Sequence, residues 1–145
     1  MKKLMPILLV IITLSLGMAA YGQSQPYKEG SVWTVSLIKT NANMNEEYLT
    51  QLKTTWIAVH DEAIKQGLII SYKVLAGSSA NPNDWDIMLL VEYKNLASLE
   101  GQDIKWDEIY KKIIGDNEAK KKLNESRISV RTIFGEKFLR EISYK

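Results

Sequence analysis

The chain has 145 residues, which is room for one domain, and it has no cysteine, so disulfides contribute nothing to its stability. Its formal net charge is +2, far from the strong excess of basic residues that is typical of nucleic-acid-binding chains. One histidine and no cysteine exclude a usual zinc or copper site, so we expect no metal and no cofactor.

Residues 1–22 have the three-part pattern of a secretory signal peptide. Lys2 and Lys3 give a positive start, a mostly apolar run follows, and small residues precede an expected cleavage after Gly22. The alternative, a membrane anchor, is less favoured because the run is short for a bilayer. We therefore expect export to the periplasm or beyond. Without Lys2 and Lys3 the 19 basic residues fall to 17, equal to the 17 acidic ones, so neither nucleic acid nor membrane is an expected partner.

The first half of the exported chain predicts a strand followed by a long helix. Residues 23–30 are polar, with a proline and a glycine, and predict a flexible leader. The segment Ser31–Lys39 predicts a strand in which Trp33, Val35 and Leu37 share one face. The apolar spacing of Asn43–Gln66 predicts one helix, with Asn43 and Glu46 as a capping box.

Two apolar runs joined by turn residues predict a β-hairpin at the centre of the sheet. They are Leu68–Ala76 and Trp85–Tyr93, and every odd position of the second run is apolar, while its even positions are mixed. A strand that is apolar on one face and half apolar on the other is expected to be covered on both faces.

The second half of the chain predicts helical pieces and a last strand. Asn95 is expected to cap a short turn, Asp103 a helix over 104–114, and Asp116 a mostly charged helix over 117–127. The segment Ile128–Phe134 predicts the last strand, and residues 135–145 are expected to form a short extra strand or an arm onto a partner. The lysines of these helices alternate with acids, which indicates a solvated face with local ion pairs.

The predicted order of elements is strand, helix, strand, strand, helical region, strand. That order is typical of an α+β, ferredoxin-like domain with a four-stranded antiparallel sheet, here over residues 31–134. The helices of such a domain cover one sheet face. The other face would be apolar, so we expect it to pack on a second copy in a homodimer. The residues expected there are Met88, Leu90, Ile70, Val74 and Val32.

Three segments resemble the dimeric α/β-barrel superfamily: VWTVSLIK, NEEYLTQLKTTWIAVHDEAIKQG and DWDIMLLVEYK. Members include stress-responsive barrel proteins, NIPSNAP-like and EthD-like proteins, and antibiotic-biosynthesis monooxygenases. The resemblance implies that two sheets pack into a shared barrel. Some of these monooxygenases work without a cofactor in an aromatic-lined cavity. Haem-handling relatives place a histidine in the second helical region, where this chain has none, which counts against a haem role.

The candidate site is a small-molecule pocket between helix and sheet, for an apolar organic ligand. His60 is the best catalytic candidate, because a histidine near neutral pKa can act as acid or base in a monooxygenase or isomerase. Arg131 is expected mid-strand, where it would pair with an acid across an interface or hold a ligand carboxylate. The residues expected to bind the ligand are Tyr48, Trp56, His60, Tyr72, Trp85, Trp106 and Arg131.

The alternative function is a non-catalytic interaction module whose apolar sheet face is only a dimer interface. On this interpretation His60 is a half-exposed helix residue without a chemical role, and the aromatic rings form core and interface. The residue types alone favour these plainer roles for His60 and for the rings.

Overall fold

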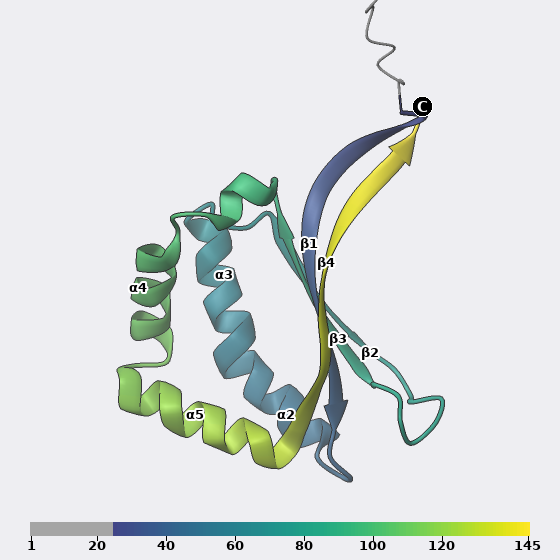
Figure 1. The fold of residues 1–145 in the computed structure, drawn as a ribbon. Helices are drawn as coiled ribbons and strands as arrows, with labels where there is room; N and C mark the ends of the chain where they lie inside the picture. Colours follow the sequence, from purple (N-terminus) through teal and green to yellow (C-terminus); the bar gives the residue numbers. More distant parts are fainter. Residues whose placement is uncertain (1–24) are drawn as a thin grey trace, which may run out of the picture.

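The computed structural model describes residues 25–145, which form a four-stranded sheet with all helices on one side of it (Figure 1). The predicted signal peptide lies outside these residues. Within them, no helix has both the length and the apolar character needed to cross a bilayer.

The sheet has the ferredoxin-like order β2-β3-β1-β4, and every neighbouring pair is antiparallel. The strands are β1 (Tyr27–Thr40), β2 (Ser71–Ala76), β3 (Ile87–Tyr93) and β4 (Arg131–Tyr144). The predicted fold class is confirmed. Only one strand of the predicted hairpin is central, however, because β2 forms an edge of the sheet while β1 and β3 lie inside it.

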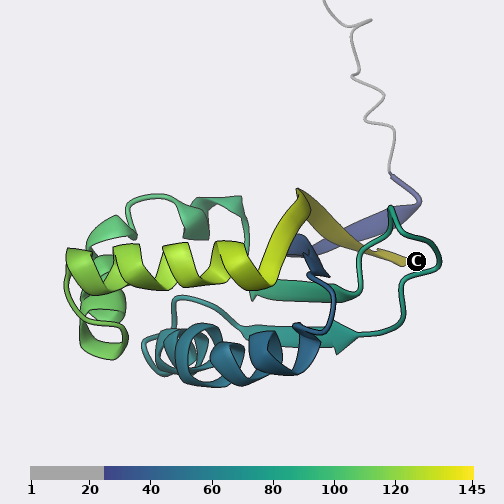
Figure 2. The same ribbon diagram turned by 90° about the horizontal axis from the view of Figure 1, so that it is seen from below.

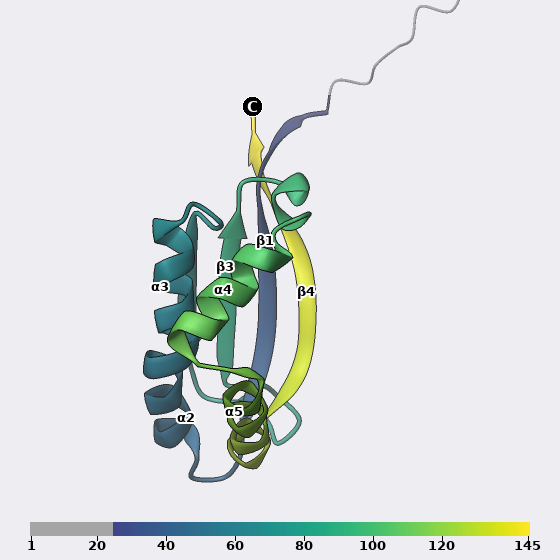
Figure 3. The same cartoon turned by 90° about the vertical axis from the view of Figure 1, so that its left-hand side faces the viewer.

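The helical layer consists of one long interrupted helix, a short turn and two further helices. Its elements are α2 (Asn45–Leu52), the π-helical turn η1 (Lys53–Ile57), α3 (Ala58–Lys65), the 3-10 turn η2 (Leu96–Leu99), α4 (Asp103–Ile113) and α5 (Asn117–Val130). In Figure 3 these helices stand in front of the sheet, and Figure 2 shows α5 from below.

Two of the predicted helix caps are confirmed and two are wrong. The side chains of Asn95 and Asp116 accept hydrogen bonds from the backbone N–H groups of Ser98 and Ala119 at 3.0 and 2.9 Å. Asn43 instead has a φ of 63°, a left-handed conformation that asparagine tolerates in a turn, and α2 starts two residues later. Asp103 is the first residue of α4 and not its cap.

The core lies between the odd positions of β3 and the helices. Ile87 and Leu89 pack in a cluster with Tyr48 and Leu52 of α2, while Val91 and Tyr93 pack with residues of α3 and α4. Side chains alternate across a strand, so the even positions Met88, Leu90 and Glu92 point to the opposite face. The predicted alternation in this strand is confirmed.

The face of the sheet away from the helices is largely apolar and has no element over it (Figure 1). The strand register places on it Trp33, Val35, Leu37, Lys73, Leu75, Met88, Leu90, Glu92, Lys137 and Leu139. We call these residues the open face. Leu75 and Leu139 are about half exposed. The prediction that Val32 and Val74 also lie here is wrong, because they pair with the helix-facing residues Tyr93 and Leu89.

The first and last strands, β1 and β4, extend beyond the predicted domain boundaries at residues 31 and 134. Residues 27–30 belong to β1 and pair with the end of β4, so the prediction of a flexible leader is wrong for them. The predicted strand start at Ile128 is also wrong, since α5 runs to Val130. Gly135 does not end the strand. It lies next to a register shift, and β4 continues through the predicted tail to Tyr144, forming with β1 a two-stranded arm beyond the helices (Figure 1).

Candidate functional site

Four of the predicted ligand-binding residues lie together between the helices and the edge of the sheet. Trp56 comes from η1, His60 from α3, Tyr72 from β2 and Trp106 from α4. The rings of Trp56 and His60 are stacked with centroids 4.0 Å apart, and His60 lies 5.9 Å from Tyr72 and 5.8 Å from Trp106. We call these four residues the aromatic cluster.

A π-helical turn precedes His60, in a segment that the sequence predicts as regular helix. Such turns are wider than an α-helix and are often found at functional sites. Here the wider turn contains Trp56, whose carbonyl accepts the His60 Nδ1–H at 2.6 Å. It also contains Thr55, whose hydroxyl donates to the carbonyl of Gln51 at 2.6 Å. The sequence did not predict this turn, because the spacing of apolar residues across it is the same as in a regular helix.

His60 is a neutral base in this environment. It is 5% exposed, and burial lowers its pKa from 6.5 to about 4 by disfavouring the charged ring, although the Trp56 carbonyl and Asp61 act in the other direction. Because Nδ1 donates its proton to the Trp56 carbonyl, the lone pair of the neutral ring lies on Nε2. At neutral pH this nitrogen can accept a hydrogen bond, and it has no proton to donate.

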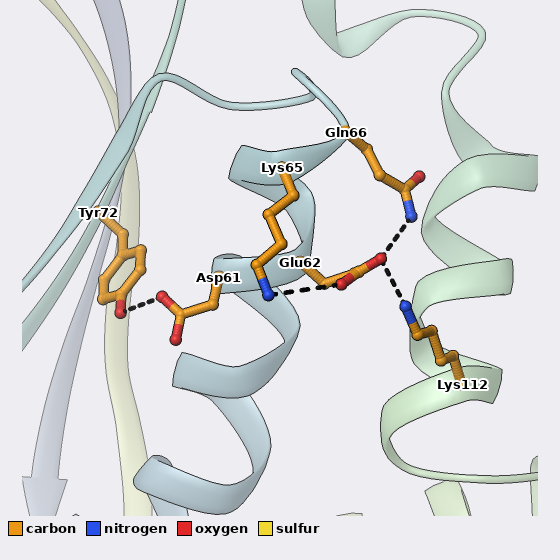
Figure 4. Close-up of polar contacts among 6 residues, drawn as sticks. All are labelled: Asp61, Glu62, Lys65, Gln66, Tyr72 and Lys112. Atoms are coloured by element: carbon orange, nitrogen blue, oxygen red, sulfur yellow. Dashed lines mark hydrogen bonds and ion pairs between the residues drawn. The ribbon is translucent and has the colours of Figure 1, made fainter.

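Two polar contacts hold α3 against its neighbours (Figure 4). The Tyr72 hydroxyl donates to Asp61 at 2.7 Å, and burial, then this bond to a carboxylate, raises the pKa of Tyr72 to about 12. On the other side, Lys112 of α4 pairs with Glu62 at 2.8 Å. Tyr72 is therefore a protonated hydrogen-bond donor at any physiological pH, and its ring is held in place beside His60.

The other three predicted residues are not part of the aromatic cluster. Tyr48 is 1% exposed in the core below it, and burial raises its pKa. The Arg131 guanidinium lies over the Tyr48 ring, 5.5 Å from its centroid. Trp85 is half-buried just before β3 begins. Arg131 is the first residue of β4 and directly follows a helix, so its predicted mid-strand position is wrong.

Arg127 is a candidate residue that the sequence prediction missed. It lies in the last turn of α5, and its Nη2 donates to the Thr55 hydroxyl at 3.1 Å. Burial lowers the pKa of Arg127, and the nearby positive charge of Arg131 lowers it further. Arg127 and Arg131 are four residues apart, a spacing that brings two side chains together along a helix. The predicted helix ended at Arg127, whereas α5 continues to Val130.

Two cavities are lined in part by Arg127. One of about 450 Å³ is lined by Asn124, Arg127, Ile128, Arg131, Thr132 and Ile133. A second, of about 310 Å³, is lined by Asp107, Tyr110, Ile114, Lys120, Leu123, Asn124 and Arg127. The ring of Tyr110 lies 6.3 Å from that of Trp106, so this second cavity borders the cluster. The cluster itself is closely packed and lines neither cavity.

The acids of the described residues do not assemble into a metal site. In residues 25–145 no three histidine, aspartate or glutamate side chains come together in a way that would hold an ion. The acids are used in other ways. Asp86, for example, accepts hydrogen bonds from the backbone N–H and the hydroxyl of Thr40, and so ties the start of β3 to the end of β1.

Among known proteins, this chain is similar in fold to solved structures of ferredoxin-like proteins. No protein-family model matches the chain, and no curated protein does. A dimeric ferredoxin-like protein of unknown function from Bacteroides fragilis is 16% identical with a TM-score of 0.42, over 77% of this chain and 95% of its own. A dimeric ferredoxin-like protein from an uncultured marine organism is 17% identical with a TM-score of 0.45, over 81% of this chain and 90% of its own.

Proposed function

We propose that this chain is an exported domain that works as a homodimer, in which two copies meet through their open faces. The observation that carries the proposal is the open face itself. It is an apolar sheet surface on the side away from every helix, and the described chain contains no further element to cover it. An apolar sheet surface that no element covers is a mark of an association site.

A second copy is the occupant that this face fits best. The central row of the face contains Val35 and Leu90, paired across β1 and β3, and ends in Lys137 of β4 and Lys73 of β2. These two cations lie on the edge strands, and Lys73 lies over the ring of Trp33 at 5.2 Å, so its stem covers apolar surface. The apolar centre of the face can meet its own copy about a twofold axis, with the lysines of the edge strands at the rim of the contact.

A charge placed at the centre of the face tests this proposal. Leu90→Glu would bring two carboxylates into an apolar interface, so light scattering during size-exclusion chromatography should change from a two-chain to a one-chain mass. Ile104→Glu is the matched control, because Ile104 is 76% exposed on α4, on the helical side. A Leu90→Glu variant that keeps both its circular dichroism and its two-chain mass contradicts the proposed interface.

We propose small-molecule binding at the aromatic cluster as a second function, favoured by the free lone pair of His60 Nε2 in an apolar surrounding. A ligand there would displace part of the packing and present an acidic C–H or O–H to this nitrogen. An isomerisation, in which His60 takes up a proton and returns it, needs no cofactor. A cofactor-independent oxidation would use dioxygen as the oxidant.

Native mass spectrometry of the protein purified from its own host tests the second function. A retained organic molecule that is absent from the His60→Ala variant supports it. Dimers that carry no added mass in either protein contradict it, and leave the homodimer as an interaction module.

A further inference from the structure

Two positive charges without an ion-pair partner lie near each other in the described residues, on Arg127 and Arg131. They lie four residues apart where α5 passes into β4, and both are partly buried. Arg127 reaches across to Thr55 of the long helix, and Arg131 lies over the ring of Tyr48. Two guanidinium groups are thus held close to each other by neutral partners, at a cost in electrostatic repulsion.

No carboxylate of residues 25–145 forms an ion pair with either arginine. The ion pairs of this part of the chain involve Glu62, Asp107 and Glu29 with other cations. Asp86 lies near Tyr48, but its carboxylate accepts hydrogen bonds from the backbone N–H and the hydroxyl of Thr40. In addition, Nε of Arg131 is enclosed and has no hydrogen-bond partner. An enclosed cationic donor without a partner is costly unless something else supplies the acceptor.

The cavity of about 450 Å³ places space for an acceptor beside these donors. Both arginines line it, together with the polar residues Asn124 and Thr132. Ile128 and Ile133 supply an apolar part of its wall. The volume is within the range of small-molecule sites. Arginine is the side chain best suited to a planar oxyanion, which its parallel N–H groups can hold at two points.

We propose that this cavity binds a small organic carboxylate, with the carboxylate held by Arg127 and Arg131 and an aliphatic body lying against Ile128 and Ile133. The acceptor oxygens would neutralise the paired charges of the two guanidinium groups. This inference goes beyond the homodimer, since the cavity is lined by a single chain, and it does not depend on His60.

Titration of the ¹⁵N-labelled protein with hexanoate tests the proposal, observed through the arginine Nε–H resonances. Hexanoate should shift the Nε–H signals of Arg127 and Arg131, whereas hexanamide, with the same body and no charge, should not. Arg131→Gln and Arg127→Gln should each weaken hexanoate binding at least about tenfold, because each removes a charged hydrogen bond. Lys122→Gln is the matched control, an equal loss of charge at an exposed position of α5 that does not line the cavity.

Several results would overturn the proposal. They are the absence of any Nε–H shift at tens of millimolar hexanoate, an equal response to hexanamide, or an equal loss of binding in Lys122→Gln. Tighter binding of inorganic phosphate than of hexanoate would overturn the ligand class. If Arg127→Gln fails to fold, as circular dichroism would show, Arg131→Gln and the wild-type shifts still decide. The result is independent of the mass of the particle, so failure here and failure of the homodimer are distinguishable.

Discussion

The burial of neutral His60 predicts that the folded protein loses stability as the pH falls below about 6.5. The pKa of His60 is lowered by burial from 6.5 to about 4, so the unfolded chain binds a proton at a pH where the folded chain does not. The contribution of the neutral ring is fully present above pH 6.5 and is lost progressively as the pH falls toward 4. The full difference amounts to about 3 kcal/mol, and about 1.4 kcal/mol of it is lost by pH 5.5.

Urea unfolding followed by tryptophan fluorescence measures this loss, at a fixed protein concentration between about pH 7.5 and pH 5.5. His60 is the only histidine, so few other groups titrate in this range. The matched control is His60→Gln, which cannot take up the proton and should show a nearly flat pH dependence. A wild-type curve as flat as that of His60→Gln would refute the reasoning, because it would mean that His60 is charged as easily in the folded state as in the unfolded one.

Two further substitutions test the packing that holds the site. Asp86→Ala removes the acceptor for Thr40 and should lower the free energy of unfolding by about 1.5–3 kcal/mol, whereas Asp84→Ala, which disturbs only loop contacts, should cost less. Ile109→Ala should cost about 2–5 kcal/mol because Ile109 is 0% exposed beneath the aromatic cluster, while Ile104→Ala should change it by less than about 0.5 kcal/mol. Urea unfolding measures both pairs, and equal costs within a pair would contradict the packing described.

The topology was predictable from the sequence because each element has its own signal. The period-two alternation in Trp85–Tyr93 survives in the structure as a buried and an open face of β3. Glycine and capping residues divided the second half of the chain into the observed helical pieces. The fold then follows from the order of elements, since few topologies accept that order with short connections.

The boundaries were less predictable, because pairing extends strands beyond their apolar runs. Residues 27–30 are polar, yet they are strand because Ile142 and Tyr144 of β4 lie opposite their segment. Likewise 128–130 read as strand from their composition, but they complete the last turn of α5. Tertiary context decided both, as it often does where intrinsic preference is weak.

The candidate site was predictable in its residue types and only partly in its geometry. Trp56 and His60 are four residues apart, which brings them together on any helix. Their contacts with Tyr72 and Trp106 depend on how three elements pack, which no local pattern specifies. The pairing of Arg127 with Arg131 was missed because it requires α5 to continue one turn further than its apolar spacing indicated.

Sedimentation equilibrium of a chain of residues 23–145 at micromolar concentration tests the central claim most directly. A sheet whose open face is apolar should not remain in water alone, so we expect a particle of two chains. A stable particle with the mass of one chain, which leaves Leu90 and its neighbours in contact with water, would contradict it.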